Sequence, residues 1–587
     1  MLSPQEEMRA TAHKSILEIQ TFWIEKIGNN TQLYKAIKSY AHNNAKKENL
    51  TKEEEYFLLE TIEDFKRSGL DLTKEKLKEV KNLKKEIAEL TLKFETNIAI
   101  DQSHITVSKN ELLGLEEEFI KSLKKTDNEN ISVGVDYPTY FNIMDNCKIE
   151  STRKKLYLAF NNRAYPKNEL VLKKIIEKRD QLAKILGFKS YAHLDLSDQM
   201  AKTPDQAATF LQELYEKAKI KEEKEFQKLS SKPPKSVQLT DDNKIKAWDI
   251  RYIKNSYKKK NFGLDENDIA QYFTMEHTVK QVLELYEAFF SLKFKQTEIS
   301  GLWHDEIKLI EVYQKEKKEI LGYLLIDLYP RPNKYSHACQ LTLIPSVNGN
   351  GPALALVVAN FPKSTETKPS LLQRNDVETF FHELGHALHA ILGRTDIASF
   401  SGTNVKTDFV EMPSQMLEEW MYDKDIIKKI SSHYKTSLPI PDTLIDKILA
   451  LKHFDSGDFL QRQCYLSALA LEYFKDGPQK DPKAIYQKLT KLMRSNIQYD
   501  KNDNMYASFG HLSGYGAKYY SYMWSKVFAV DLFNHVKKHG LLNPKIGTKY
   551  VNLIIGKGGS LDPNNLLKEF LSREPNQKAF IRSLGLI

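Results

Sequence analysis

Residues 380–390 read FFHELGHALHA, which places three histidines and one glutamate within a short apolar stretch. At about 100° per residue, the histidines fall on one side of a helical wheel and the large apolar side chains fall on the other. This segregation predicts an amphipathic helix that packs on the core with one face and presents imidazoles on the other. Asn375 is the expected N-cap, with Glu378 three residues later, and Gly393 is the expected C-terminal stop.

The polar face of this predicted helix has the spacing of a metal site. His382 and His386 are four residues apart, about one helical turn, so both imidazoles can reach one tetrahedral Zn²⁺. Glu383 falls on the flank of the histidine face, where a carboxylate can take a proton from a metal-activated water. The competing interpretation is a chance match on a core helix. The motif favours zinc over that alternative.

Two histidines and a water leave one position for another protein ligand. The segment GTNVKTDFVEMPSQMLEEW, residues 402–420, offers Glu411 in an apolar setting, where a carboxylate is costly unless it is paired or bound. Pro413 places Glu411 close to a helix start or a kink. Glu418 and Glu419 can lie on the same face as Glu411 and hydrogen-bond a ligand histidine. A solvated helix charge is the equal alternative for these two residues.

The chain around this region is helical, with one β-prone interval. Helical periodicity dominates from residue 1 to about 300, with one proline-containing break, SSKPPKS, at 230–236. Three short, apolar and β-prone segments follow, at 321–331, 340–345 and 353–361. VNGNG at 347–351 is a hairpin signal between the last two. Helical patterning resumes at 375, so the predicted fold class is mainly α with a small β-sheet.

Length and composition exclude several classes of protein. The 587 residues are enough for several domains or one large fold of two lobes, and 41% hydrophobic with 28% charged residues is typical of a soluble globular chain. The net charge of +9 is small beside 87 basic and 78 acidic residues that interleave along the helices. We therefore expect neither a nucleic-acid surface nor a membrane surface.

The cysteine content and the hydropathy of the sequence predict the cellular compartment of the protein. Cys147, Cys339 and Cys464 are odd in number and far apart, which argues against a disulfide framework and favours a reducing environment. The longest apolar run, ALALVVA at 353–359, is shorter than the roughly 18 residues that span a bilayer. The start of the sequence does not have the pattern of a secretory signal. A cytoplasmic protein is expected.

Three segments together carry a resemblance to a known family. They are PSLLQRNDVETFFHELGHALH at 369–389, FSGTNVKTDFVEMPSQMLEEW at 400–420 and FGHLSGYGAKYYSYMW at 509–524. These segments resemble the signatures of the thimet oligopeptidase and neurolysin family, which also contains bacterial oligopeptidase A and dipeptidyl carboxypeptidase. The likeness continues elsewhere in the chain, for example in DLYPRPNKYSHA at 327–338. It therefore covers nearly the whole sequence.

The resemblance implies both an architecture and a site. The fold would be a two-lobed ellipsoid with a deep central cleft, the helix that carries the HExxH motif on the cleft wall, and one Zn²⁺ per chain. An approximate division assigns 1–70 plus 256–450 to the zinc-bearing lobe and 71–255 plus 451–587 to the second lobe. By match to the family, the zinc ligands are His382, His386 and Glu411, the general base is Glu383, and Glu418 supports a ligand. Short unstructured peptides are the expected substrates of a monomer.

The third signature segment adds hydrogen-bond donors beside a glycine-rich loop. Following the family, Tyr522, Tyr515 and His511 would be catalytic donors to the oxyanion. Tyr515, Tyr519 and His511 would contact substrate. Helical spacing alone would make several of these tyrosines core aromatics instead. The loop reads HLSGYG where the family more often has two glycines before the first tyrosine, so His511 is expected at a shifted height.

Two alternatives to a zinc endopeptidase stay open at this point. A dipeptidyl carboxypeptidase would use the same fold and chemistry but release dipeptides. A non-catalytic peptide-binding protein would keep the fold without needing Glu383 as a base. In either case, the segment at 353–361 would offer a strand edge to which an extended peptide could pair.

Overall fold

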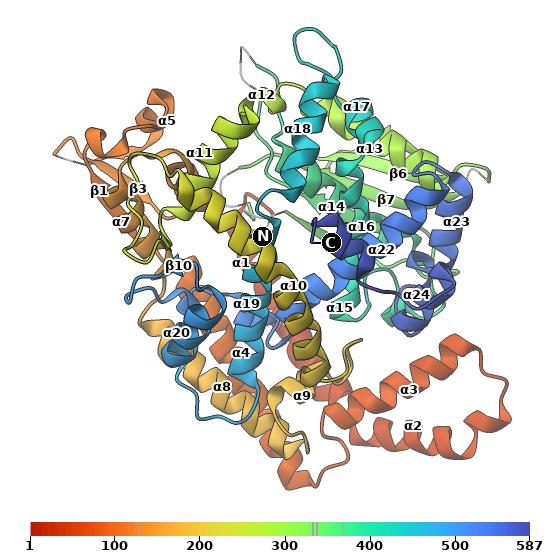
Figure 1. Cartoon of the computed structure of the whole chain (residues 1–587). Coiled ribbons are helices and arrows are strands. Elements are labelled where there is room, and N and C mark those ends of the chain that lie inside the picture. The colour runs from red at the N-terminus through yellow and green to blue at the C-terminus, as the bar shows by residue number, and fades with distance from the viewer. Residues whose placement is uncertain are drawn as a thin grey trace.

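The computed structural model describes residues 2–586 except 127, 318, 332, 333, 336, 337, 365 and 367, and it does not describe the side chains of 13, 17, 20, 21, 24 and 25. Four residues of the 327–338 segment therefore lie outside the described residues. The fold is mainly helical with small sheets, as predicted, and Figure 1 shows the sheet with β1 and β3 on the opposite side of the molecule from the sheet with β6 and β7.

The helices of the first half of the chain are α1 Glu6–Phe22, α2 Thr31–Asn43, α3 Lys52–Arg67, α4 Lys74–Ala99, α5 Glu117–Ser122, α6 Tyr137–Asn146, α7 Glu150–Asn161, α8 Lys167–Ile185, α9 Tyr191–Leu196, α10 Pro204–Ser231, α11 Ile250–Phe262, α12 Glu266–Ala270 and α13 Met275–Phe290. Those of the second half are α14 Arg374–Leu392, α15 Thr407–Val410, α16 Met412–Glu418, α17 Lys424–Ile430, α18 Asp442–His453, α19 Ser456–Phe474, α20 Pro482–Met493, α21 His511–Gly514, α22 Ser521–His539, α23 Pro544–Leu553, α24 Pro563–Leu571 and α25 Lys578–Ser583. The predicted break at 230–236 coincides with the end of α10.

The largest sheet has five strands in the order β5-β6-β7-β9-β8. Its members are β5 Leu292–Thr297, β6 Lys308–Gln314, β7 Ile320–Asp327, β8 Cys339–Ile344 and β9 Ala353–Val358. The three predicted segments form β7, β8 and β9, and VNGNG joins the antiparallel pair β8 and β9 as expected. The sequence did not predict β5 and β6, since their alternating charged residues resemble the exposed faces of the helices nearby.

The prediction that 353–361 offers a free strand edge is wrong. β9 pairs in parallel with β7 on one side and antiparallel with β8 on the other. Its almost wholly buried, apolar sequence is typical of an interior strand. The outer strand is β8, which exposes Leu341, Leu343 and Ile344. Any peptide that adds to this end of the sheet must pair with β8.

Helix α14 packs on this sheet with its apolar face. Phe380, Phe381, Leu384 and Leu388 are each fully buried in the core that β7 and β9 also line. Burial of each such side chain contributes about 1.5–3 kcal/mol to the free energy of folding. These contacts fix α14, and with it the histidines, against the sheet. The helix and its apolar face are confirmed, but His389, expected on the exposed histidine face, is fully buried.

The ends of α14 differ partly from the prediction. Gly393 is the C-terminal cap, as expected, and its N–H donates to the carbonyl of His389. The N-cap is Gln373 and not Asn375, and its backbone N–H donates to the Asp376 carboxylate at 2.9 Å. The helix begins earlier because the Gln373–Asp376 pair satisfies the first free backbone donors that Asn375 was expected to cap.

Two further large apolar cores lie outside the α14 region. One joins α8, α10 and α19, and the other joins α6 and α7 to the small sheet β1-β3-β2. That sheet comprises β1 His104–Val107, β2 Lys124–Lys125 and β3 Ile131–Gly134, and the remaining pair is β4 Ile245–Lys246 with β10 Ile497–Gln498. Strands of two to four residues are too short to show a period in the sequence, so they were not predicted.

The domain boundaries remain a prediction, and one observation bears on them. Apolar side chains between Ala529 and Leu571, on α22, α23 and α24, are buried in the same core as α14. The division had assigned these residues to the second lobe. The chain therefore returns to the α14 core after it leaves α19.

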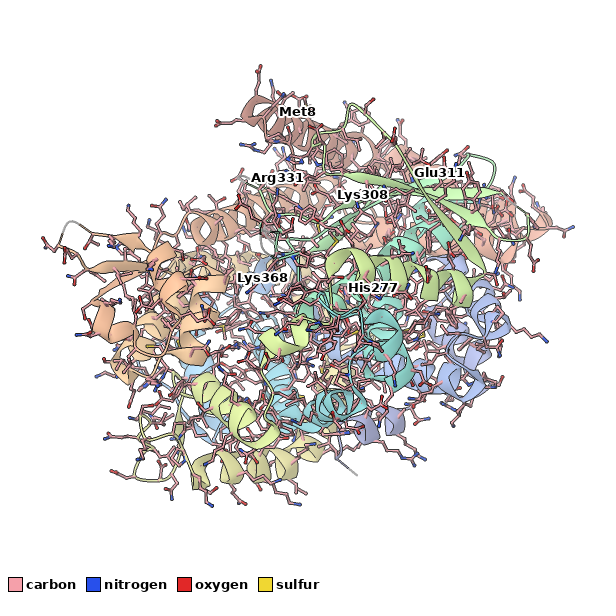
Figure 2. The ribbon with its side chains drawn as sticks, turned by 90° about the horizontal axis from the view of Figure 1, so that it is seen from above. Met8, His277, Lys308, Glu311, Arg331 and Lys368 are labelled. Atoms are coloured by element: carbon pink, nitrogen blue, oxygen red, sulfur yellow. The ribbon has the colours of Figure 1, made fainter. Side chains whose placement is uncertain are left out.

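The start of the chain contacts the region of the large sheet. The Arg331 guanidinium donates to the carbonyl of Leu2 at 2.9 Å. Figure 2 shows Met8 of α1 on the same side of the molecule as Arg331 and the β6 residues Lys308 and Glu311. Among the helices that the structure describes, none is both long and apolar enough to cross a membrane. Cys147, Cys339 and Cys464 are free thiols, as the sequence predicts.

Candidate metal centre

Three predicted ligands converge at one point. His382 Nε2 lies 3.1 Å from His386 Nε2, and Glu411 Oε2 lies 3.2 Å from each of these nitrogens. Ligand atoms at about 2.0–2.1 Å from a tetrahedral Zn²⁺ lie about 3.3 Å from one another. The triangle therefore has close to the size that a zinc ion requires, and the donor set of two imidazoles and one carboxylate suits it.

The charges and hydrogen bonds around these groups also favour a cation between them. Burial opposes the charged imidazolium, yet hydrogen bonds to Glu411 and Glu418 raise the pKa of His382 to about 10. Burial likewise opposes the charged form of Glu411, but hydrogen bonds from the two histidines hold its pKa well below the usual range. Positive charge in this cluster is therefore strongly stabilised, whether a proton or a metal ion supplies it.

Glu411 reaches the histidines because two helices approach closely. It stands between α15 and α16, at the kink expected from Pro413. A Cβ at Gly385 of α14 would lie 2.9 Å from the Cα of Ser414 on α16, a distance that carbon atoms do not adopt. Glycine at 385 thus allows the backbones of α14 and α16 to come into contact. This close approach brings the Glu411 carboxylate within reach of His382 and His386.

Glu418 and Glu419 are not solvated helix charges. Glu418 Oε1 lies 2.5 Å from His382 Nδ1, and its other oxygen accepts a hydrogen bond from Lys526 at 2.7 Å. The Glu419 side chain is 3% exposed and pairs with Lys526 and Lys452. With Nδ1–H donated to Glu418, the Nε2 lone pair of His382 points at the metal position.

Lys526 is the buried counter-charge of this network, and the sequence did not predict it. Charges of Glu418 and Glu419 raise its pKa although burial works in the opposite direction. Its ammonium group lies 2.7 Å from Glu418 Oε2 and 3.1 Å from Glu419 Oε1. It lies on α22, four residues after Tyr522, in a segment whose charges resemble those of any other helix.

We expect Lys526→Met to lower zinc affinity by about tenfold, the scale on which loss of an outer hydrogen-bond partner acts. Methionine fills the space but leaves Glu418 without its cation, so the carboxylate holds His382 less well. Chelator competition measures the affinity, with circular dichroism as a check of folding. Lys526→Arg, which keeps the charge, is the matched control. An unchanged affinity in a folded Lys526→Met protein would contradict this role.

Glu383 lies beside the triangle without joining it. Its side chain is buried, and burial raises its pKa, although the neighbouring histidines work in the opposite direction. Tyr335 is a neighbour that sequence reasoning missed: burial raises its pKa and the charge of Glu383 adds to the shift. The 327–338 segment was recognised only as part of a resemblance, and nothing in its spacing indicated that Tyr335 faces the site.

The predicted donors form one aromatic cluster. The ring of His511, at the start of α21, lies 5.5 Å from Tyr515, 5.0 Å from Tyr519 and 5.9 Å from Tyr522. Burial raises the pKa of both Tyr515 and Tyr522, and the charge of Glu411 adds to each shift, so both phenols stay protonated beside the triangle. The two hydroxyls hydrogen-bond to each other, and a ligand oxygen could accept a hydrogen bond in place of this one.

Tyr519 and its neighbour Tyr520 fit the core interpretation better. Tyr519 is 7% exposed and donates to Gln463 Oε1 at 3.2 Å. Tyr520 is fully buried and donates to the carboxylate of Asp408 at 2.8 Å. Only one face of the segment at 515–522 therefore presents its tyrosines near the metal triangle.

Asp408 is a buried junction that the sequence did not reveal. Its carboxylate accepts hydrogen bonds from the backbone of Met200 and Ala201 at 2.9 and 3.0 Å, besides the one from Tyr520. Ser525 donates to the Asp408 carbonyl at 2.8 Å. One residue thus ties the turn before Glu411 to the turn that carries the tyrosines.

Two adjoining cavities open near the aromatic cluster of His511, Tyr515 and Tyr519. One, of about 1970 Å³, is bounded by Asp376 and Thr379 of α14 on one side and by strands β1 to β3 on the other. The second, of about 1130 Å³, is lined by His511, Tyr515 and Tyr519. Tyr335 lines both. Space for an extended chain thus runs past the aromatic cluster.

Most of the chain is similar to known peptidases. The sequence profile of peptidase family M3 matches residues 143–586. Saccharolysin of Saccharomyces cerevisiae is 35% identical over 571 residues, which cover 92% of this chain and 79% of that protein. Thimet-like oligopeptidase of Dictyostelium discoideum is 31% identical (93% and 84% covered), and oligopeptidase A of Escherichia coli is 28% identical (89% and 80% covered).

A solved structure supports the fold independently. PZ peptidase A with an inhibitor superposes with a TM-score of 0.61 at 14% sequence identity, over 100% of this chain and 87% of that one. At this identity the likeness concerns the fold alone.

Proposed function

The chain belongs to peptidase family M3, and on that premise we propose that it cleaves short unstructured peptides with one Zn²⁺ held by His382, His386 and Glu411. It is a metallo-oligopeptidase. The observation that carries the proposal is the triangle of ligand atoms at 3.1–3.2 Å with Glu383 buried at its flank. A non-catalytic peptide-binding protein would not need this base, and the comparisons give no support to that alternative.

The chemistry divides between the ion and the side chains. When bound, Zn²⁺ supplies a Lewis acid that makes water nucleophilic near neutral pH. Glu383 accepts a proton from the attacking water and passes it to the leaving amine; its raised pKa suits both transfers. Tyr522 or Tyr515 donates a hydrogen bond to the oxyanion that develops on the scissile carbonyl. We propose that His511 contacts the substrate, whereas Tyr519, whose hydroxyl is held by Gln463, contributes its ring to the wall of the same cavity.

The architecture proposed for this reaction is the two-lobed ellipsoid with a deep central cleft. Support comes from the cavities between α14 and strands β1 to β3. The outer edge of β8, the strand next to α14, could pair with the backbone of an extended peptide. Backbone pairing tolerates many side chains, so we propose broad specificity. We further propose a cytoplasmic monomer.

Tyr522→Phe is expected to lower kcat by about 10²- to 10³-fold with little change in KM, since the lost donor acts on charge that develops in the transition state. Steady-state kinetics on one peptide measures both constants. Tyr519→Phe is the matched control, because its hydroxyl is already bound to Gln463 and should matter less. A change in KM alone would make Tyr522 a substrate-binding residue.

The proposed function is tested by substrate length. A folded protein would have to unfold several kcal/mol of structure to bring its backbone to the metal, so cleavage should fall as substrates grow beyond short peptides. Zinc-loaded protein is incubated with unstructured peptides of increasing length and with a folded domain, and products are followed by mass. Undiminished cleavage of the longest peptide would contradict a deep cleft.

The same products separate two modes of cleavage. Endopeptidase action is the proposal, and dipeptidyl carboxypeptidase action is the alternative. A peptide blocked at its C-terminus and its unblocked twin should both be cut internally by an endopeptidase. Release of dipeptides from the unblocked twin alone would instead favour the alternative.

A further inference from the structure

The smaller cavity carries an excess of positive charge. Its ionisable walls comprise six cations and three acids: Arg163, Arg251, Lys254, Lys258, Arg462 and Arg494 against Asp145, Asp455 and Asp458. An unbalanced set of like charges in a partly enclosed space attracts ligands of the opposite sign. The question is which of these cations is free to bind one.

The three acids are already matched. Arg251 binds Asp145 through two nitrogens at 2.7 and 2.8 Å. Lys254 pairs with Asp455 at 2.5 Å, and Asp458 is held by Lys254 and Arg494. These pairs neutralise half of the cations. The surplus belongs to Arg163, Lys258 and Arg462.

Arg462 differs from the other two surplus cations in having no ring or hydrogen-bond partner. The guanidinium of Arg163 lies 3.9 Å from the ring of Phe160, and Lys258 lies 5.8 Å from the ring of Phe454. Within the part of the chain that the structure describes, Arg462 makes no hydrogen bond and no ion pair, and its side chain is exposed to the cavity. Its donors are therefore available to a ligand.

Arg462 is also close to the catalytic side of the cavity. The next residue on α19, Gln463, accepts the Tyr519 hydroxyl, and the Tyr519 ring lies 5.4 Å from Tyr522. One turn earlier, Phe459 lines the same cavity and is 47% exposed. This face of α19 thus presents an apolar surface beside an unpaired guanidinium, a few side chains from the proposed oxyanion donor.

We infer that Arg462 is a substrate-binding residue that receives a carboxylate of the peptide and thereby gives the protein a preference for anionic substrates. The planar guanidinium fork matches a carboxylate with two parallel hydrogen bonds, and the surplus charge around it disfavours cationic segments. The carboxylate is either the C-terminus of the peptide or an acidic side chain. The inference rests on the proposed function, since it concerns peptides that reach the metal triangle.

Binding is measured first, on zinc-loaded protein that carries Glu383→Gln so that peptides stay intact. Calorimetry compares a peptide acid with its C-terminal amide, and an internal glutamate with glutamine. We expect one carboxylate to improve the dissociation constant by about 10- to 100-fold, the range for a hydrogen bond to a charged group. Arg462→Gln should abolish that difference, and Arg462→Lys should retain part of it.

The control variant removes one positive and one negative charge from the wall of the same cavity. The double variant Asp145→Asn, Arg251→Gln deletes one paired acid and one paired cation, so the net charge of the wall is unchanged. It should keep the preference for the carboxylate. Loss of the preference in this variant, or its persistence in Arg462→Gln, would overturn the assignment to Arg462.

Kinetics with the unmodified catalytic residue separates the two hypotheses. Equal kcat/KM for all four peptides, with cleavage intact, would overturn the inference and leave the proposed function standing. A carboxylate-dependent affinity without any cleavage would overturn the proposed function alone. Which of the two peptide pairs shows the difference identifies the terminal or the side-chain carboxylate.

Discussion

Glu383→Gln is expected to lower kcat by about 10³-fold or more while zinc content stays at one ion per chain. Glutamine has the size of glutamate and can hydrogen-bond a water, but it cannot accept a proton at neutral pH. Because Glu383 stands beside the ligand triangle and not within it, its replacement leaves the three ligand atoms in place. Single-turnover kinetics and metal analysis on the same sample measure the two quantities.

Glu378→Gln is the matched control for this variant. Glu378 is a half-buried carboxyl group of α14, and burial also raises its pKa, but it contacts the hydroxyl of Tyr422 rather than the triangle. Activity close to that of the parent protein is expected there. Wild-type turnover in zinc-loaded Glu383→Gln would exclude Glu383 as the base.

Glu411→Ala is expected to abolish stoichiometric zinc binding and, with it, activity. Two histidines alone leave a catalytic zinc site with one protein ligand too few. The loss of affinity should exceed the roughly 10–100-fold effect of removing an outer partner, such as that expected of Lys526→Met. Zinc content after gel filtration measures the result.

Glu419→Gln serves as the control for Glu411→Ala, because Glu419 lies in the same segment and is as deeply buried but pairs with lysines. It should retain zinc. Full zinc occupancy in a folded Glu411→Ala protein would place the third ligand elsewhere and overturn the assignment.

The sequence predicts the part of the site that follows a local rule. The α14 face follows from the helical period, and Glu411 stands out because an unpaired carboxylate does not belong in an apolar segment. Both signals depend on neighbours in the chain. The Gln373 cap was missed because several polar residues precede the helix and only the folded geometry selects one of them.

The residues that were missed act through distant parts of the chain. Lys526 meets Glu418 across 108 positions, and Asp408 meets Met200 across 208. Each looks like an ordinary surface charge in its own segment. Arg462 is similar, since what distinguishes it is that no described residue forms a hydrogen bond or ion pair with it in a cavity that other helices line. Tertiary packing decides these roles, and the pattern of polar and apolar residues within one segment does not reveal it.

The junction at Asp408 has a consequence for the order in which the protein becomes active during synthesis. The metal triangle is complete in sequence at residue 411, whereas the tyrosine that closes the same junction is residue 520 and the proposed donor is residue 522. A growing chain thus acquires its ligands more than a hundred residues before its oxyanion donor. Under the proposed assignment, a chain interrupted between residues 411 and 520 would contain the proposed zinc ligands and base but not the oxyanion donor. We expect such a chain to hydrolyse peptides far more slowly than one that includes Tyr522.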